Sequence, residues 1–273
     1  MDQLKRLSLK EIQQKELDLL KKIDTFCIEN AIIYFLAYGT LIGAIRHGGF
    51  ISWDDDIDII MPRPDYNKFI SLKEKFCFSF VNTDIKTFKD KDYYYPFIKV
   101  VDTSTIARET HIRKKFTTHI WVDVFPLDGV FDDDQKNKKL FFKQKIYTRI
   151  LTSGKILPFR MKGGVIVKVL GTMFIPFGII LNHLFNFSSI LDKLSKLQSY
   201  EMSEKVADVC VGYGISEIVY KNEIFPLIKE KFEGYDFFIP ANYHKYLTQL
   251  YGDYMKLPPE NKRRTHNVEA FEL

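Results

Sequence analysis

The spacing of apolar residues predicts a helix near the start of the chain and a strand directly after it. Residues 8–29 carry apolar side chains at helical intervals, and the sequence SLKE at residues 8–11 has the form of a capping box. The apolar segment 31–39 is short and bounded by Asn and Gly, which is typical of a buried strand. Residues 40–47 then predict a short helix that ends at a pair of glycines.

The next segment predicts a strand that contains an unusual number of carboxylates. Residues 52–61, SWDDDIDIIM, read as a strand that prolines close before a helix in 64–76. Further apolar runs separated by polar turns predict strands at 77–82, 96–102, 104–109 and 120–128. This order predicts a mixed sheet flanked by helices, an α/β or α+β catalytic core over residues 1–131, and we take α+β as the expected class.

The pattern changes from residue 132 onward. Residues 132–151 predict a helix with acidic residues first and basic residues afterwards. No Lys, Arg, Asp or Glu occurs between Lys168 and Asp192, although Gly, Pro and Asn interrupt this stretch. For residues 155–187 three interpretations stay open: a helical hairpin packed on the core, a segment on a membrane surface, and a membrane span. We expect residues 132–273 to form a mostly helical, substrate-binding C-terminal portion packed on the core.

Composition and charge narrow the classes of function. The chain has 273 residues, of which 46% are hydrophobic, so it can bury a substantial core. A net charge of +5 is compatible with an anionic ligand but is far from a nucleic-acid-binding signature, so we expect no nucleic-acid partner. Three scattered cysteines without metal-ligand spacing indicate reduced thiols in a cytoplasmic protein, and the charged N-terminus lacks the apolar segment of a secretory signal.

The four clustered aspartates predict a metal site. Side chains alternate along a strand, so Asp54, Asp56 and Asp58 are predicted on one face, with Asp55 on the other as a control position. Carboxylates this close ionise together only when a cation neutralises them. Oxygen ligands favour Mg²⁺, with Mn²⁺ as an alternative.

An EF-hand loop and a solvated acidic turn fit the cluster less well than a metal-binding strand. An EF-hand loop needs Gly at its sixth position and Glu at its twelfth, where this chain has Ile59 and Asp65. A solvated acidic turn does not account for the apolar residues that follow directly.

Two further features place the aspartates in a larger site. The order of elements here resembles the nucleotidyltransferase fold: a strand, a turn at Gly39 and Thr40, a helix, and a strand with spaced aspartates. In that fold the turn and the helix N-terminus hold phosphate. Asp123 lies in an apolar run where an isolated carboxylate is costly, which predicts a metal ligand or general base. Asp128, in the turn-like sequence PLDG, is read as structural.

Three segments together are similar to the LicD family of phosphocholine transferases of bacterial surface polymers. They are YGTLIGAIRHGGFISWDDDIDI from residue 38, WVDVFPLDG from residue 121 and LYGDYMKLPPENKRRTHN from residue 250. Many members have Pro where this chain has Ser52. The resemblance implies transfer of phosphocholine from CDP-choline to a sugar hydroxyl of a teichoic-acid or lipopolysaccharide-type glycan, with release of CMP. The distant fukutin-type relatives transfer ribitol phosphate.

The resemblance also adds basic and aromatic candidates to the site. Lys262, Arg263 and His266 match the family's basic motif, which is expected to close over substrate phosphates, although an exposed basic tail is the alternative. Arg46 and His47 either meet the diphosphate or act as favourable cations at a helix C-terminus. A quaternary ammonium prefers an aromatic cage, for which the candidates are Tyr93, Tyr94, Tyr95, Trp121 and Tyr251, and the sequence does not select among them.

The expected partners follow from the same chemistry. They are CDP-choline and a lipid-linked glycan acceptor, which a cytoplasmic enzyme would meet through peripheral contact with the inner face of the cell membrane. Two other functions stay open: transfer of a different nucleotide-activated polyol phosphate or of a nucleoside monophosphate, and a non-catalytic role in assembly.

Overall fold

The computed structural model describes residues 4–90, 93, 95–110, 112, 117–153, 155, 165–210, 213–263, 265 and 267–273. The helices are α1 (Leu9–Glu29), α2 (Tyr38–His47), α3 (Arg63–Ser71), α4 (Lys73–Ser79), α5 (Asp134–Leu151), α6 (Val165–Leu184), α7 (Phe187–Ser195), α8 (Lys221–Ile224) and α9 (Tyr243–Tyr251), with short 3₁₀ turns η2 (Gly214–Glu217) and η3 (Glu260–Lys262). The strands are β1 (Phe35–Leu36), β2 (Asp58–Pro62), β3 (Thr83–Lys86), β4 (Ile98–Glu109), β5 (Thr118–Gly129), β6 (Lys205–Ala207), β7 (Val219–Tyr220), β8 (Leu227–Phe232), β9 (Tyr235–Pro240) and β10 (Val268–Glu272).

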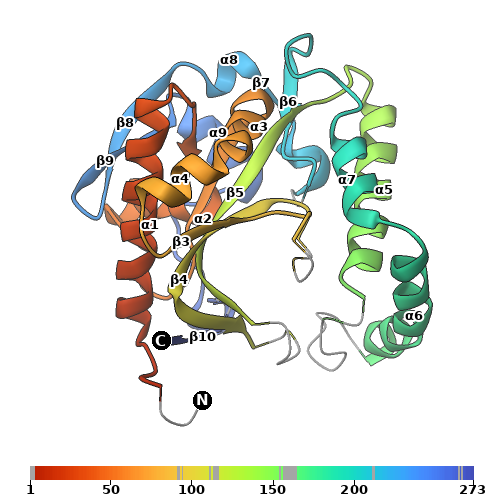
Figure 1. Ribbon diagram of the computed structural model, residues 1–273. Helices are drawn as coiled ribbons and strands as arrows, with labels where there is room; N and C mark the ends of the chain where they lie inside the picture. The colour runs from red at the N-terminus through yellow and green to blue at the C-terminus, as the bar shows by residue number, and fades with distance from the viewer. Residues whose placement is uncertain are drawn as a thin grey trace.

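A curled mixed sheet forms the centre of the protein (Figure 1). Within the described residues, its main path runs β1-β2-β5-β4-β10, while β3 pairs with β4, and β6 and β7 extend the far end of β5. The pair β2–β5 is parallel and the other pairs are antiparallel. The α+β fold expected from the sequence is confirmed, and the sheet takes strands from both halves of the chain.

Helices cover the sheet through faces that the sequence pattern anticipates. Helix α1 packs its apolar face against β4 and β5, and its predicted capping box is present, with Ser8 Oγ accepting from the Glu11 amide at 3.3 Å. Helix α2 ends at Gly48, whose φ of +68° favours glycine. The β8–β9 hairpin packs beside β1 and α2.

Several predicted strands have different bounds in the structure. Residues 77–82 were expected to form a strand, but α4 continues to Ser79 because Phe76 packs edge-on against two other rings in the core. The two strands expected at 96–102 and 104–109 are one strand, β4, with a register shift after Asp102. The strand expected at 31–39 is reduced to β1 because α2 already begins at Tyr38.

A buried ion pair fixes the far end of β5. Asp128 accepts from Arg63 Nε at 2.5 Å and from its Nη2 at 2.8 Å, and both side chains are nearly inaccessible. Asp128 lies in β5 rather than in the turn suggested by its sequence, and burial raises its pKa to about 6 despite the partly opposing effect of Arg63. This carboxylate has the structural role that was expected of it.

Helices α5, α6 and α7 form a separate layer beside the sheet, on the right in Figure 1. Helix α6 contains Pro176 and packs on α5. Among the described residues, no helix is both long and apolar enough to span a membrane. The part of residues 155–187 that lies within α6 is a helix packed on α5. Its contact with a membrane surface stays a prediction.

Candidate active site

The parallel pairing of β2 with β5 brings two aspartates side by side. Asp58 and Asp123 are register partners on these strands, so their side chains emerge at the same position of the sheet. Like charges directly opposite one another destabilise a sheet unless something neutralises them. The topology therefore concentrates negative charge at this position of the sheet.

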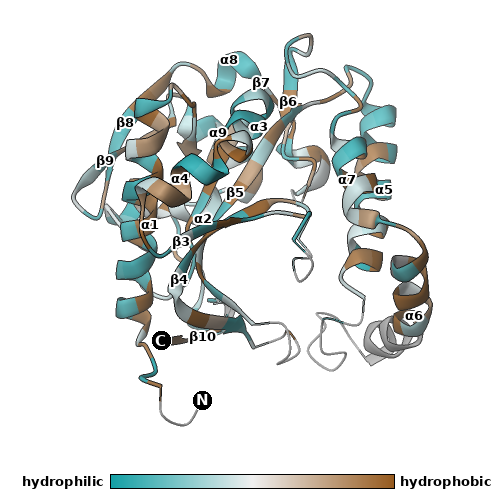
Figure 2. Cartoon of the chain, viewed as in Figure 1, coloured by the Kyte–Doolittle hydropathy of each residue, from teal (hydrophilic) through white to brown (hydrophobic). Residues whose placement is uncertain are grey.

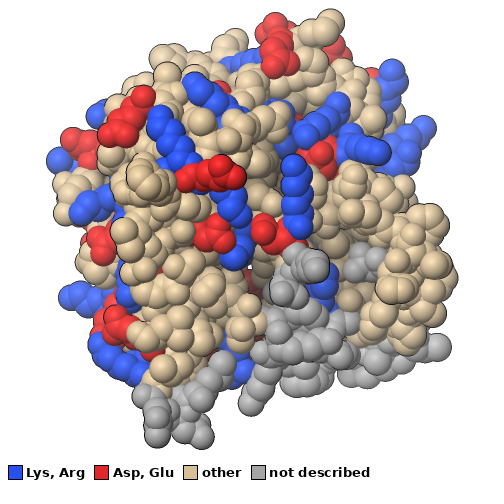
Figure 3. Space-filling view, viewed as in Figure 1, with Lys and Arg blue, Asp and Glu red and all other residues tan. Residues whose placement is uncertain are grey.

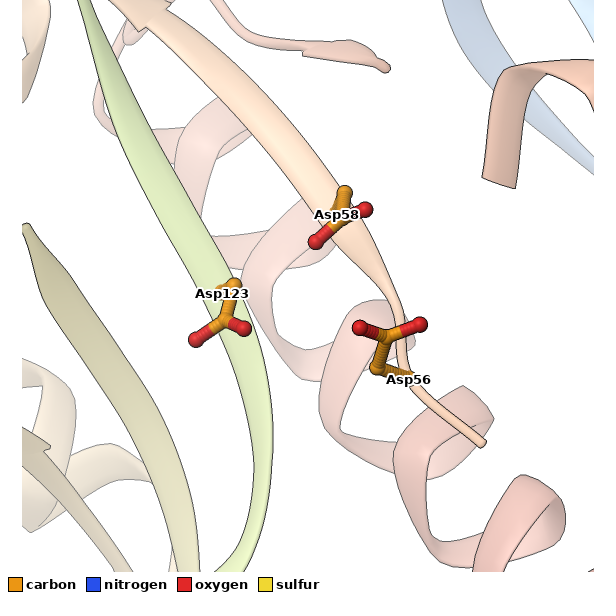
Figure 4. A group of neighbouring side chains, drawn as sticks. All are labelled: Asp56, Asp58 and Asp123. Atoms are coloured by element: carbon orange, nitrogen blue, oxygen red, sulfur yellow. The ribbon is translucent and has the colours of Figure 1, made fainter. Parts of the chain in front are cut away.

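Asp56 joins this pair from the segment just before β2. Asp56 lies outside strand β2. The next residue, Ile57, already runs alongside β5, because its carbonyl accepts from the Asp123 amide at 2.8 Å. Asp56, Asp58 and Asp123 each offer a carboxylate oxygen, and these oxygens lie within 4.8 Å of one another. Figure 4 shows the three side chains around a common space.

Asp54 lies in the same pocket but outside this group of three. The expected strand over 52–61 was wrong in its first half, since β2 begins at Asp58 and a turn joins the Asp54 amide to the Ile51 carbonyl at 2.8 Å. Strict alternation therefore does not apply to Asp54 and Asp56. As a metal ligand, Asp54 stays a prediction.

Gly39 is the reason Asp54 can approach the first turn of α2. A Cβ at Gly39 would lie 2.7 Å from Asp54 Oδ2, so any side chain would displace that carboxylate. Thr40 is buried, and its hydroxyl accepts from the Asp58 amide at 2.8 Å. In this structure Thr40 thus fixes the start of β2, and its contact with a diphosphate oxygen stays a prediction.

The carboxylates open into a pocket of about 690 Å³ with aromatic walls. Its lining includes Gly39, Asp54, Asp56, Asp58 and Asp123, together with the rings of Tyr38, Tyr95, Phe97, Trp121, Phe125, Tyr213 and Tyr251. This size and this mixture of apolar walls with a few polar groups are typical of small-molecule sites.

A buried lysine holds Asp123 in place. Lys99 is 2% exposed, and its Nζ lies 2.9 Å from Asp123 Oδ1. Trp121 Nε1 donates to Asp123 Oδ2 at 3.1 Å. The ammonium also lies 3.9 Å from the Trp121 ring centroid and 4.4 Å from that of Tyr95. We call Lys99, Tyr95, Phe97 and Trp121 the lysine group.

A buried glutamate lies behind the acidic segment. Glu16 is on the packed face of α1 and only 1% exposed. Burial, followed by repulsion from Asp56 and its acidic neighbours, raises the pKa of Glu16 well above its ordinary value. A nearby helix residue, Gln13, donates to the Asp54 carbonyl at 2.8 Å.

Asp55 faces away from the pocket, as expected, but it is not a neutral control position. It is 4% exposed and accepts from the Val268 amide at 3.0 Å. The carboxylate therefore attaches the acidic segment to β10.

The predicted basic residues lie in different places. Arg46 and His47 occupy the last turn of α2, where Arg46 donates to the Tyr254 carbonyl at 2.6 Å, and neither is among the described residues that line the pocket. Burial, and then Arg46, lowers the pKa of His47. Arg263 stacks 4.5 Å from the Trp53 ring, next to the acidic segment. The Lys262 side chain and His266 lie outside the described residues.

Sequence reasoning missed Lys99, Glu16 and Asp208, a buried carboxylate that also lines the pocket. A signal was present for each. Lys99 and Asp208 are isolated charges in apolar runs, the pattern that identified Asp123, and Glu16 occupies an apolar-face position of its helix.

Comparison with known proteins gives a consistent assignment. The family model described as LicD/FKTN/FKRP, nucleotidyltransferase domain, matches residues 31–160. The lipopolysaccharide cholinephosphotransferase LicD of Haemophilus influenzae is 32% identical over 273 residues, which cover 97% of this chain and 98% of that protein. An uncharacterized protein of Rickettsia typhi is 29% identical over 133 residues, covering 48% of this chain and 40% of that protein.

The chain therefore belongs to the LicD family. This confirms the resemblance found in its motifs. The division at residue 131 and the roles of individual site residues stay predictions.

Proposed function

We propose that this protein transfers phosphocholine from CDP-choline to a sugar hydroxyl of a cell-surface glycan and releases CMP. The observation that carries the proposal is the group of Asp56, Asp58 and Asp123 in an aromatic-walled pocket. The full-length similarity to a protein named as a lipopolysaccharide cholinephosphotransferase supports this choice of substrates. A glycan of either the lipopolysaccharide or the teichoic-acid type would supply the hydroxyl.

The donor set suits a hard divalent cation. Three carboxylates within 4.8 Å offer only oxygen ligands, as Mg²⁺ and Mn²⁺ prefer, and their mutual repulsion is relieved by such an ion. We propose that Asp56, Asp58 and Asp123 hold it, with Asp54 as a further ligand. When bound, the ion neutralises charge on the donor's diphosphate.

The residues of the chain would then position the reacting groups. In the transfer, the acceptor oxygen bonds to the choline-bearing phosphorus, and the bond from this phosphorus to the bridging oxygen breaks, so CMP leaves. The hydroxyl proton passes to a base. Asp123 serves either as this base or as a metal ligand, and Lys99 and Trp121 orient it for both roles.

The test of this proposal is CMP release. Purified protein should release CMP from CDP-choline when Mg²⁺ and a choline-free glycan acceptor are present, and EDTA should stop the reaction. CDP-ribitol and nucleoside triphosphates, assayed in parallel, test transfer of polyol phosphate or of a nucleoside monophosphate. Turnover of one of these but not of CDP-choline would replace the proposal, and no turnover of any would favour an assembly role.

We also propose that the protein meets a lipid-linked acceptor at the inner face of the membrane through α6. This helix and the residue after it expose large apolar side chains, namely Phe174, Phe177, Ile179, Ile180, Leu184 and Phe185. The surface of the described part of α6 is tan in Figure 3, without acidic or basic side chains, and much of it is brown in Figure 2. Such a face suits the headgroup boundary of a bilayer.

Vesicle sedimentation tests this contact. The wild type should sediment with phospholipid vesicles, and Phe177→Ser combined with Ile180→Ser should reduce the bound fraction severalfold. With a soluble acceptor, the variant should still release CMP from CDP-choline. An equal bound fraction for wild type and variant would exclude α6 as the contact.

A further inference from the structure

Two groups of aromatic rings flank the carboxylates, and among the residues that the structure describes one of the two holds a cation. The first is the lysine group. The second, which we call the tyrosine group, consists of Tyr38, Phe125, Tyr213 and Tyr251. Its ring centroids lie 5.5 Å apart for Tyr38–Phe125, 5.9 Å for Tyr38–Tyr213 and 5.4 Å for Tyr213–Tyr251. Both groups line the same pocket.

The lysine group shows how this pocket holds a primary ammonium. Lys99 Nζ lies over the Trp121 and Tyr95 rings, donates a hydrogen bond to Asp123 Oδ2 at 3.3 Å and forms an ion pair with Asp123 Oδ1 at 2.9 Å. Because this position is taken by the protein's own cation, a second cation there would be repelled.

The tyrosine group also lies beside a carboxylate, that of Asp208, but the partners of this carboxylate differ from those of Asp123 in the lysine group. Asp208 is fully buried beside the tyrosine group, and in the described part of the chain no Lys or Arg lies over these rings. Tyr38 donates its hydroxyl to Asp208 Oδ2 at 3.0 Å, and the Cys210 amide donates to Oδ1 at 2.7 Å. Each oxygen of Asp208 therefore already accepts a bond from the protein, and the ring faces are what this group offers to a cation. This suits a cation that has no N–H group to donate.

The position of Tyr38 places this group next to the phosphate site. The Ala37 amide donates to the Asp58 carbonyl at 3.0 Å, and Tyr38 follows directly. Tyr38 has a φ of +47°, a strained conformation for a bulky residue, and such strain is characteristic of functional positions. In choline, only two carbon atoms separate the phosphate-ester oxygen from the quaternary nitrogen.

We propose that Tyr38, Tyr213 and Tyr251, with Asp208 behind them, form the subsite for the trimethylammonium group of the donor. The inference rests on the proposed function and names the part of the site that selects choline. A quaternary ammonium is recognised by ring faces and negative charge, and it loses little hydration on entering such a site. A primary ammonium loses three N–H bonds to water and finds few acceptors there.

Equilibrium binding tests the subsite without requiring turnover. Calorimetry with Mg²⁺ should give a Kd for CDP-choline about tenfold lower than that for CDP-ethanolamine. Tyr213→Leu should remove most of this preference, whereas Tyr213→Phe, which retains the ring, should keep it. Tyr213 is more than half exposed, so both variants should fold. Tyr251→Leu provides a second test, and Mn²⁺ binding should be unchanged in all three.

The two proposals can fail separately. Equal Kd values for the two donors in the wild type, or a preference that survives both Leu substitutions, would overturn the tyrosine subsite while leaving CMP release intact. In the opposite case, the wild type binds CDP-choline selectively and loses this preference on both Leu substitutions, but no acceptor leads to release of CMP. That result would support the subsite and refute the transferase.

Discussion

Strand β5 contains two buried aspartates whose surroundings differ, one near its middle and one near its end. Asp123, near the middle of the strand, faces a pocket beside two other carboxylates and a buried lysine. Asp128, near the end, is enclosed in the core with a bidentate arginine partner. Both are isolated carboxylates in one apolar run, and the sequence separated them only through the turn-like PLDG around Asp128, which lies in the strand.

The difference lies in what the neighbouring strand contributes. Beside Asp123, β2 supplies another aspartate, so negative charge is concentrated there even though Lys99 lies 2.9 Å from Asp123. Beside Asp128, Arg63 begins the helix that follows β2 and neutralises the charge internally. The first arrangement is predicted to serve activity at the expense of stability, and the second to serve stability alone.

The largest expected effect is on activity at the Asp123 end. Asp58→Asn removes a ligand charge without changing shape and should lower the rate of CMP release by about three orders of magnitude, because metal neutralisation of a transferred phosphate is worth several kcal/mol. Asp56→Asn should act in the same way. In EDTA the melting temperature of either variant should equal or exceed that of the wild type, since repulsion is relieved.

An exposed acidic residue provides the matched control for this prediction. Asp134, in the first turn of α5, is solvent-accessible, and Asp134→Asn should leave the rate unchanged. Near-wild-type rates in Asp56→Asn and Asp58→Asn would mean that the acidic segment is not the metal site.

The next effect is on stability at the Asp128 end. Arg63→Met leaves a buried carboxylate without its partner and should lower the free energy of unfolding by about 3–5 kcal/mol, measured by urea denaturation. Replacing Asp128 with Leu in the same chain should recover part of this loss. The folded fraction of Arg63→Met should keep its rate, and a rate loss like that of Asp58→Asn would erase the distinction between the two ends.

Local patterns predicted the carboxylate side of the site better than the tyrosine side. Asp56, Asp58 and Asp123 lie in two short segments, where apolar residues on either side predict adjacent buried strands. The tyrosine group draws Tyr38, Tyr213 and Tyr251 from segments far apart in the chain, and no periodicity links them. Tertiary packing also fixed where β2 begins, because a turn outweighs strand propensity over residues 52–57.

Asp55 sharpens the contrast within the acidic segment itself. Its carboxylate accepts from the Val268 amide, so Asp55→Ala should leave that partly buried donor without this acceptor and cost about 1 kcal/mol or more of unfolding free energy. Asp55→Asn retains an acceptor oxygen and should cost less. The folded Asp55→Asn protein should still release CMP, and a thousandfold rate loss there would place Asp55 with its neighbours in the metal site.

Glu217 shows a third way to bury a carboxyl group, by keeping it neutral. It is 2% exposed, and burial, with a further contribution from Asp208, raises its pKa to about 8, although the Tyr213 amide and the Tyr38 hydroxyl act in the opposite direction. In the unfolded chain this group ionises near its ordinary value of 4.5. Between these two values folding takes up a proton, so the free energy of unfolding falls as pH rises, by about 1.4 kcal/mol per pH unit.

The smallest expected effect is therefore a change in how steeply the free energy of unfolding falls with pH. From pH 6.5 to pH 8, the wild type should lose about 1–2 kcal/mol more unfolding free energy than Glu217→Gln, measured by urea denaturation at both values. Asp128, with a pKa of about 6, titrates mostly below this window, and Glu16 is present in both proteins and cancels in the difference. Parallel pH profiles would mean that Glu217 is ionised in the folded protein.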